Sequence, residues 1–457
     1  MRACCLILAS LSLVWAAEPA DWIVTARFVV PMDLSKRVID NGAVAVRGKL
    51  ILAIGARADI DRSYTPKKRL DRGEAILLPG LINTHTHAPM SLLRGIADDL
   101  RLQDWLEKYI FPAEAKNVNR DFVRWGTLLA CAEMMLSGTT TYTDMYYFED
   151  TIAEATRQCG MRGVLGETII GFPAPDYKTP AETLVATRKF IAQFKNDALI
   201  VPAVAPHAIY TNSAETLQAA AKLADEMDAP MLIHVSETKK ENDDAFAKYK
   251  MSPTAYLNSL NAIARRTLFA HAVWTDAGDW SIMARRHIGV AHCPSSNMKL
   301  ASGVAPVERI RRAGVAVGLG PDGPAGSNND FNMFEEMDLA AKLSKVTTMN
   351  PESLPARDVV AMATIEGARA LQMESSIGSL EPGKRADLIT VRIDQPNALP
   401  WHDVYAMLVY ALKGSDVRDV MIDGRWTVVD RHVVTLDWPE VARHAKQIRA
   451  QVEASLH

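Results

Sequence analysis

The sequence predicts an α/β fold, in which a (β/α)8 TIM barrel is joined to a small β-sandwich domain built from both chain ends. Eight apolar runs of β character lie between residues 77 and 323, and segments of helical spacing separate them. Shorter β-like runs precede residue 75 and return between residues 384 and 437. Parallel strands that are buried on both faces and alternate with helices are what a closed barrel requires.

The domain order follows the chain. In the sandwich, an Arg47-Gly48 turn separates two β-like runs, and Asp423-Gly424 between alternating apolar residues is typical of a two-residue hairpin loop. We expect a signal peptide at 1–17, the first part of the β-sandwich at 18–75, the (β/α)8 barrel at 76–373, the second part of the sandwich at 374–440 and a C-terminal helix at 441–457.

The barrel strands are read from the apolar runs, and segments such as 215–229 and 306–314 have the spacing of the helices between them. A doubly wound open sheet is the alternative, but it would normally carry a glycine-rich phosphate turn after its first strand, and the sequence has none there. The eight expected strands lie within residues 77–87, 139–147, 162–170, 199–207, 230–237, 266–274, 289–295 and 315–323.

The N-terminal segment "MRACCLILASLSLVWAA" predicts export. It places one arginine before about a dozen apolar residues and ends in small alanines, as a secretory signal peptide does. The apolar run is shorter than the roughly 20 residues that span a bilayer, so we expect no stable membrane span. The protein would be periplasmic or secreted, and cytoplasmic if this segment is not a signal.

Composition limits the partners. Of the 457 residues 48% are hydrophobic and 23% charged, and the net charge of −3 offers no basic surface for nucleic acid. A small-molecule substrate is the expected partner, and the sequence leaves open whether the chain forms a homo-oligomer. Cys131, Cys159 and Cys293 are widely scattered, which is typical of buried thiols rather than of a disulfide framework.

Polar side chains end four of the expected barrel strands. His85 and His87 stand at alternate positions, so both can face the barrel axis, while His234, His271 and Asp322 close three later runs. The carboxyl ends of barrel strands are where barrel enzymes place their chemistry. Imidazoles and a carboxylate suit one divalent metal ion, with Zn²⁺ as the first expectation and Fe²⁺ as the alternative.

Five motifs then carry a resemblance that covers nearly the whole chain after the signal. They are "PGLINTHTHAPMSLLRG", "APHAIYT", "IHVSETKKE", "HCPSSNMKLASGVAP" and "GLGPDGPAGSNND", in this order. The sequence resembles the amidohydrolase superfamily in its mononuclear deaminase branch, and most closely the 5-methylthioadenosine/S-adenosylhomocysteine deaminases.

This resemblance implies a set of residue roles. The metal ligands would be His85, His87, His234 and Asp322. The catalytic residues would be Glu237, His271 and Asp322, with Trp105, Glu114, His207 and Glu237 contacting the substrate.

The expected reaction is hydrolytic deamination of adenosine-type nucleosides, which releases ammonia after metal-bound hydroxide attacks the purine C6. Asp322 would take a proton from the attacking water, and Glu237 would protonate the adjacent ring nitrogen. The alternatives are a deaminase or chlorohydrolase acting on another N-heterocycle, such as guanine, cytosine or a triazine, and an exported binding protein without catalysis. A cytidine-deaminase-type zinc site is excluded, because its H-x-E and P-C-x-x-C pattern is absent.

Overall fold

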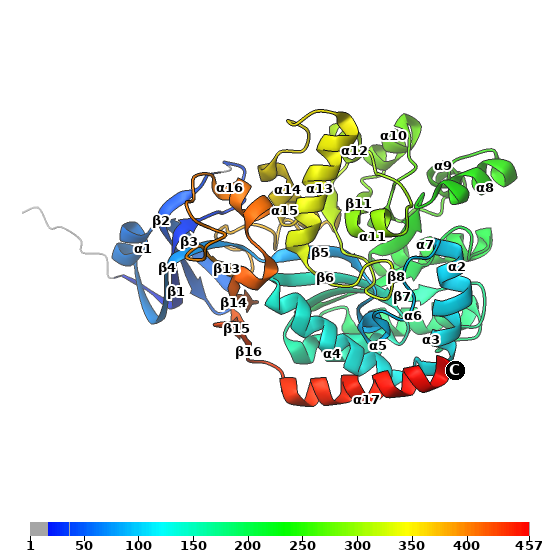
Figure 1. Cartoon of the computed structure of the whole chain (residues 1–457), viewed down its shortest axis with the longest axis horizontal. Helices are drawn as coiled ribbons and strands as arrows, with labels where there is room; N and C mark the ends of the chain where they lie inside the picture. Colours follow the sequence, from blue (N-terminus) through cyan, green and yellow to red (C-terminus); the bar gives the residue numbers. More distant parts are fainter. Residues whose placement is uncertain (1–16, 36, 457) are drawn as a thin grey trace, which may run out of the picture.

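The structure is a computed structural model that describes residues 17–35 and 37–456, and its centre is a closed barrel of eight parallel strands (Figure 1). Around the barrel the strands follow the order β10-β11-β12-β5-β6-β7-β8-β9. Closure confirms the predicted (β/α)8 barrel and excludes the open sheet. The strands are β5 (Leu81–Thr86), β6 (Thr139–Tyr146), β7 (Arg162–Ile169), β8 (Ile200–Pro206), β9 (Met231–Val235), β10 (Thr267–His271), β11 (Gly289–His292) and β12 (Val317–Leu319).

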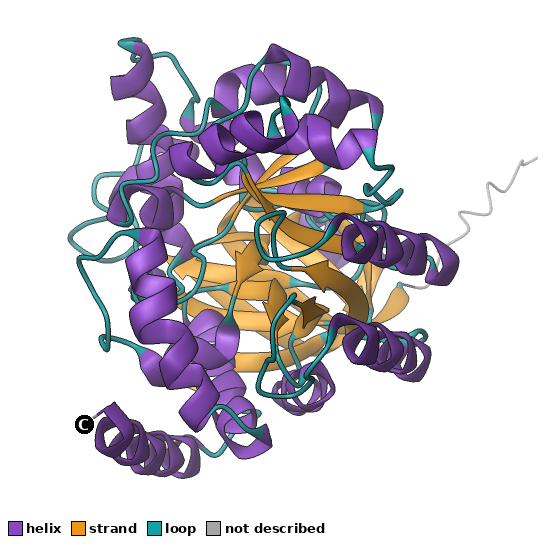
Figure 2. Ribbon diagram, turned by 90° about the vertical axis from the view of Figure 1, so that its right-hand side faces the viewer, coloured by secondary structure: helices purple, strands orange, loops and turns teal. Residues whose placement is uncertain are grey.

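Helices surround the barrel, as Figure 2 shows in the view turned by 90°. The two helical segments singled out in the sequence form α7 and α12. The helices around and after the strands are α4 (Arg120–Leu136), α5 (Glu149–Cys159), α6 (Pro180–Phe194), α7 (Ala214–Met227), α8 (Lys239–Tyr249), α9 (Pro253–Ser259), α10 (Ala277–Arg285), α11 (Pro294–Lys299), α12 (Val307–Arg312), α13 (Met333–Thr348), α14 (Ala356–Met362) and α15 (Ile365–Ala370).

The second β unit combines both chain ends, as predicted, and its strands form one continuous mixed sheet in the order β16-β15-β14-β13-β4-β1-β2-β3. Asp423 and Gly424, with φ of 50° and 78°, form the expected two-residue loop between β14 and β15. The strands are β1 (Glu18–Val29), β2 (Ile39–Arg47), β3 (Leu50–Ala56), β4 (Tyr64–Pro79), β13 (Leu388–Arg392), β14 (Val417–Ile422), β15 (Arg425–Val429) and β16 (His432–Val433), with the short helix α1 (Arg57–Ser63) before β4.

The apolar run at 77–87 does not form one strand but contributes to two strands in different sheets. Its first residues end β4 in the mixed sheet, and its remainder forms β5 in the barrel. The chain passes between them at Gly80, where a Cβ atom would lie 2.1 Å from the side chain of Thr140. Only glycine fits this close approach, which sequence patterning alone does not reveal.

The segment after β5 covers one side of the barrel mouth. It contains η1 (Ala88–Leu93), α2 (Leu102–Trp105), η2 (Leu106–Ile110) and α3 (Phe111–Asn117). The C-terminal helix α17 (Trp438–Leu456) runs beside α4 and α3 (Figure 1), where Asn117 Nδ2 donates to Ser455 Oγ at 2.7 Å. The remaining short helices are α16 (Val404–Ala406), η3 (Met407–Ala411) and η4 (Gly414–Asp416).

Two expectations concern the N-terminus and membranes. Of the expected signal peptide, residues 1–16 lie outside the described residues. Within residues 17–35 and 37–456, no helix has both the length and the apolar character that a membrane span needs.

Candidate active site

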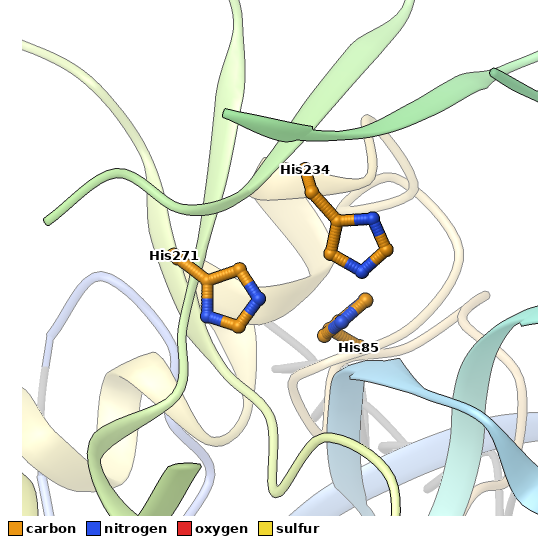
Figure 3. Close-up of side chains that lie close together, drawn as sticks. All are labelled: His85, His234 and His271. Atoms are coloured by element: carbon orange, nitrogen blue, oxygen red, sulfur yellow. The ribbon is translucent and has the colours of Figure 1, made fainter. Parts of the chain in front are cut away.

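Five polar side chains come together at the carboxyl ends of the barrel strands. His85 lies near the end of β5 and His87 directly follows that strand, while His234 lies in β9, His271 ends β10, and Asp322 follows β12. In Figure 3 the rings of His85, His234 and His271 face one another from different strands. Sequence positions almost 240 residues apart therefore converge here because the barrel closes.

Their ligand atoms are close enough to share one ion. His85, His234 and His271 offer nitrogens that all lie within 4.8 Å of one another, and His85, His87 and Asp322 form an overlapping group with the same limit. Asp322 Oδ1 is 3.3 Å from the Nε2 atoms of both His85 and His87. The five residues are thus one cluster that is nearly or fully buried.

Hydrogen bonds fix how three of the imidazoles point. The Nδ1 atom of His87 lies 2.7 Å from Met145 O, and that of His234 lies 2.8 Å from His207 O. The Nδ1 atom of His271 is 3.0 Å from the amide oxygen of Asn297. Because each oxygen only accepts, each Nδ1 carries a proton, and Nε2 is the nitrogen left available to a metal ion.

The cluster fits a resident divalent ion. His85 Nε2 is buried without a hydrogen-bond partner among the described residues, and such an orphaned atom is explained by a missing ligand. Imidazole nitrogens and one carboxylate are the donor set that Zn²⁺ takes in catalytic sites. Imidazoles whose other nitrogen donates to an oxygen are the usual form of metal ligands.

Burial and charge act differently on the two neighbouring histidines. Burial lowers the pKa of His85 to about 4, which keeps this imidazole neutral, as a metal ligand must be. At His87 burial is outweighed by the hydrogen bond and charge of Asp322, by the Met145 carbonyl and by the charge of Asp144, so its pKa rises to about 9. Burial alone would raise the pKa of Asp322, but the close approach of His85 and His87 outweighs it and holds the pKa of this carboxyl well below its usual range.

Backbone strain gathers at the same strand ends. Ser236, His271 and Asp322 have φ of 54°, 72° and 65°, in the left-handed region that non-glycine residues rarely occupy. Such positions cost about 1–3 kcal/mol each and are typical of functional sites, where the surrounding structure enforces them.

Glu237 lies at the rim of the cluster and is buried. Its Oε2 atom is 3.8 Å from Nε2 of His271. Burial, reinforced by the negative charge of Asp322, raises the pKa of Glu237 to about 8. This carboxyl group is therefore protonated at neutral pH and able to donate a proton inside the site.

The three predicted substrate contacts line the cavity above the cluster, together with Glu237. The Trp105 indole N–H donates to Ala325 O at 2.9 Å, which ties the segment after β5 to the loop after Asp322. Glu114 accepts the hydroxyl of Tyr146 at 2.7 Å, and burial raises the pKa of Glu114 to about 7. His207 Nδ1 lies 3.1 Å from Thr211 Oγ1. All the sequence-predicted site residues therefore line one cavity except His85, which belongs to the buried cluster beside it.

Two residues at this site were missed by sequence reasoning. Ser296 Oγ donates to Asp322 Oδ2 at 2.7 Å, and Asn297 orients His271. Both belong to the "HCPSSN" motif, whose polar residues directly after the seventh apolar run were the available signal.

Comparisons with known proteins agree with this geometry. The sequence profile of the amidohydrolase family matches residues 76–427. The chain is 42% identical over 439 residues to 5-methylthioadenosine/S-adenosylhomocysteine deaminase 1 of Syntrophus aciditrophicus, covering 96% of this chain and 99% of that protein. It is 43% identical over 434 residues to the 5-methylthioadenosine/S-adenosylhomocysteine deaminase of Syntrophobacter fumaroxidans, covering 95% and 99%.

Solved structures give the same picture. An adenosine deaminase from Xanthomonas campestris with bound zinc is similar with a TM-score of 0.94 and 38% identity, covering 96% of this chain and 100% of that one. The atrazine chlorohydrolase TrzN from Arthrobacter aurescens, complexed with zinc, has a TM-score of 0.86 at 23% identity, covering 94% and 100%, and shares the fold.

Proposed function

The chain belongs to the amidohydrolase family, and from that premise we propose that it is a metal-dependent hydrolytic deaminase of adenosine-type nucleosides. The expected substrates are 5-methylthioadenosine, S-adenosylhomocysteine and adenosine. The observation that carries this proposal is the position of Glu237, buried and with its pKa raised to about 8, in one cavity with Asp322 and beside the cluster of four histidines. The relatives named as deaminases and the zinc-bound adenosine deaminase support it.

One divalent ion, Zn²⁺ by preference, would be held by His85, His87, His234 and Asp322. Such an ion supplies Lewis acidity, which lowers the pKa of water from about 15.7 to about 7. The His234 ring is oriented by the His207 carbonyl at 2.8 Å. This orientation presents its Nε2 atom toward the cluster rather than toward the cavity wall.

The chain's own residues then handle the protons. Asp322, whose carboxyl stays ionised, accepts a proton from the attacking water. Glu237 donates its proton to the ring nitrogen next to the amino-bearing carbon, so negative charge does not build up on the purine. His271, held by Asn297, directs its Nε2 atom at the attacking oxygen. The proton held by Asp322 then passes to the amino group, and the C6–N bond breaks to release ammonia. The proton of the new C6 hydroxyl returns to Glu237 as the carbonyl forms. Adenosine and water thereby give inosine and ammonia, and both carboxyl groups regain their starting protonation.

The presence of a proton donor at Glu237 favours deamination over dehalogenation as the reaction. Amine departure requires a proton donor for both the ring nitrogen and the leaving group, whereas chloride leaves without one. A buried carboxyl with a pKa raised to about 8 meets that requirement.

Residues of the cavity wall orient the substrate. The face of Trp105 covers the purine, and Glu114 accepts hydrogen bonds from the ribose hydroxyls. His207 donates to the sugar or to a thioether substituent on it. Because Glu114 already accepts from Tyr146, its carboxyl is fixed before substrate binds.

Export is part of the proposal. The support is the composition of residues 1–17, with its single arginine and apolar run. N-terminal sequencing of the protein from its native source tests it, and an N-terminus that begins at Met1 would refute export.

The activity is tested by screening zinc-loaded protein for ammonia release from adenosine, 5-methylthioadenosine, S-adenosylhomocysteine, guanine and cytosine. We expect release from the three nucleosides. Release from guanine or cytosine alone would refute the proposed substrate class.

A further inference from the structure

A buried carboxylate lies behind the site, outside the cavity. Glu336 is in the first turn of α13, and its side chain is fully buried. It accepts hydrogen bonds from the backbone N–H of Ser295 at 3.2 Å, from the hydroxyl of Ser295, and from Asn328 Nδ2 at 3.3 Å. One carboxylate thus joins the start of α11 to the loop after β12, at residues 33 apart in sequence.

The first of these segments carries the partners of two catalytic groups. Directly after Ser295, Ser296 donates to Asp322 at 2.7 Å. The next residue, Asn297, lies 3.0 Å from Nδ1 of His271. Fixing both the backbone and the hydroxyl of Ser295 therefore fixes the start of α11, from which these two side chains project.

The second segment follows Asp322 itself. Asn328 Nδ2 also donates to Pro321 O at 2.9 Å, and Asn328 N donates to Gly323 O at 2.9 Å. The two acceptors stand on either side of Asp322. Asn328 therefore closes the turn around Asp322, and Glu336 holds Asn328 against the start of α11.

In this arrangement Glu336 is the hydrogen-bond acceptor, and Ser295 and Asn328 are its donors. A fully buried carboxylate is tolerated only when hydrogen-bond donors surround it, and these donors in turn need an acceptor. Without Glu336, the start of α11 and the loop after β12 lose an acceptor that both contact. Residues that orient metal ligands from outside typically change metal affinity or activity by about 10–100-fold when removed.

We propose that Glu336 is a positioning residue of this enzyme: by clamping Ser295 and Asn328 it sets the orientation of Asp322 and His271. It touches neither the metal cluster nor the cavity. The inference rests on the proposed function for its kinetic consequence, while its consequence for metal affinity does not depend on the substrate.

The experiment compares Glu336→Ala and Glu336→Gln with Glu335→Ala, an exposed glutamate in the same helical turn. Zinc affinity is measured by competition with a chromophoric chelator, and kcat and KM are measured with adenosine. Thermal melting is recorded alongside. Partial unfolding lowers the amount of active protein, but it does not change the zinc affinity of the molecules that remain folded, so affinity separates positioning from stability.

For Glu336→Ala we expect zinc affinity and kcat each to fall about 10–100-fold, with KM within threefold of the wild-type value. For Glu336→Gln we expect zinc affinity and kcat between those of Glu336→Ala and the wild type, each at least threefold below the wild type. Its amide oxygen still accepts a hydrogen bond, but its amide nitrogen faces a donor. Glu335→Ala should match the wild type. If Glu336→Ala does not fold, Glu336→Gln decides by the same two readouts.

Wild-type zinc affinity and kcat in the folded Glu336 variant would overturn the inference, whatever its melting temperature. A wild-type protein that binds zinc but releases no ammonia from nucleosides would overturn the proposed function alone. In that case the chelator competition still decides on Glu336, because it uses no substrate.

Discussion

The replacement Glu237→Gln removes the proposed proton donor with almost no change in shape. Because burial raises its pKa to about 8, Glu237 is mostly protonated at pH 7. Glutamine can hydrogen-bond to the ring nitrogen but cannot transfer a proton to it. Loss of a positioned acid typically costs about 10²–10⁴-fold, or roughly 3–5 kcal/mol of transition-state stabilisation. We therefore expect kcat for adenosine to fall by that factor, with KM within threefold.

The pH dependence of kcat tests the same proton-donor role of Glu237. As pH rises through about 8, the wild-type carboxyl loses its proton, so kcat should decline on the alkaline side. The variant should lack this decline. The assay is initial-rate ammonia release from zinc-replete protein, with zinc content and melting temperature recorded for both proteins. Glu215→Gln, at an exposed glutamate on α7, is the control for a glutamate-to-glutamine change outside the site. A Glu237→Gln variant within threefold of wild-type kcat would refute the role.

Three further predictions follow from the geometry. Glu114→Ala should raise KM for adenosine at least tenfold more than KM for free adenine, measured by ammonia release; an equal effect on both would refute ribose binding. Asn297→Ala removes the acceptor that holds His271 Nδ1 at 3.0 Å and should lower kcat by about 10–100-fold, and an unchanged kcat would contradict this orientation. Burial raises the pKa of Glu241 to about 8, so the folded protein keeps a proton that the unfolded chain, with a glutamate pKa near 4.3, releases. Stability should therefore fall as pH rises from about 5 to about 8.5, and Glu241→Gln should flatten this slope in melting curves; an unchanged slope would show that Glu241 is ionised in the folded state.

Most of the barrel and of the metal cluster could be predicted from strand periodicity and from the polar residues at the strand ends. Alternation places His85 and His87 on one side of β5, and a closed parallel barrel necessarily gathers the ends of β9, β10 and β12 at the same mouth. The cluster was therefore predictable without any distance. The hairpin at Asp423-Gly424 was predictable for a local reason, since its two residues favour positive φ.

Features that depend on contacts between distant segments were not predictable. The run at 77–87 reads as one strand, and only the approach of Thr140 to Gly80 shows that it divides between two sheets. Ser296 and Asn297 are ordinary loop residues in sequence. In the sequence, Glu336 looks like a surface glutamate of a helix, which its neighbour Glu335 is. Only the packing of the structure shows that Glu336 is buried between α11 and the loop after β12. A single sequence does not encode such pairings in its local pattern.

The proposed metal centre is one divalent ion shared by four side chains from three strand ends. Anomalous diffraction at the zinc edge from crystals of zinc-loaded protein measures this directly. We predict a single peak at about 2.0–2.2 Å from a nitrogen of His85, His87 and His234 and from an oxygen of Asp322. A peak elsewhere in the chain, or a cluster without one in zinc-replete crystals, would contradict it.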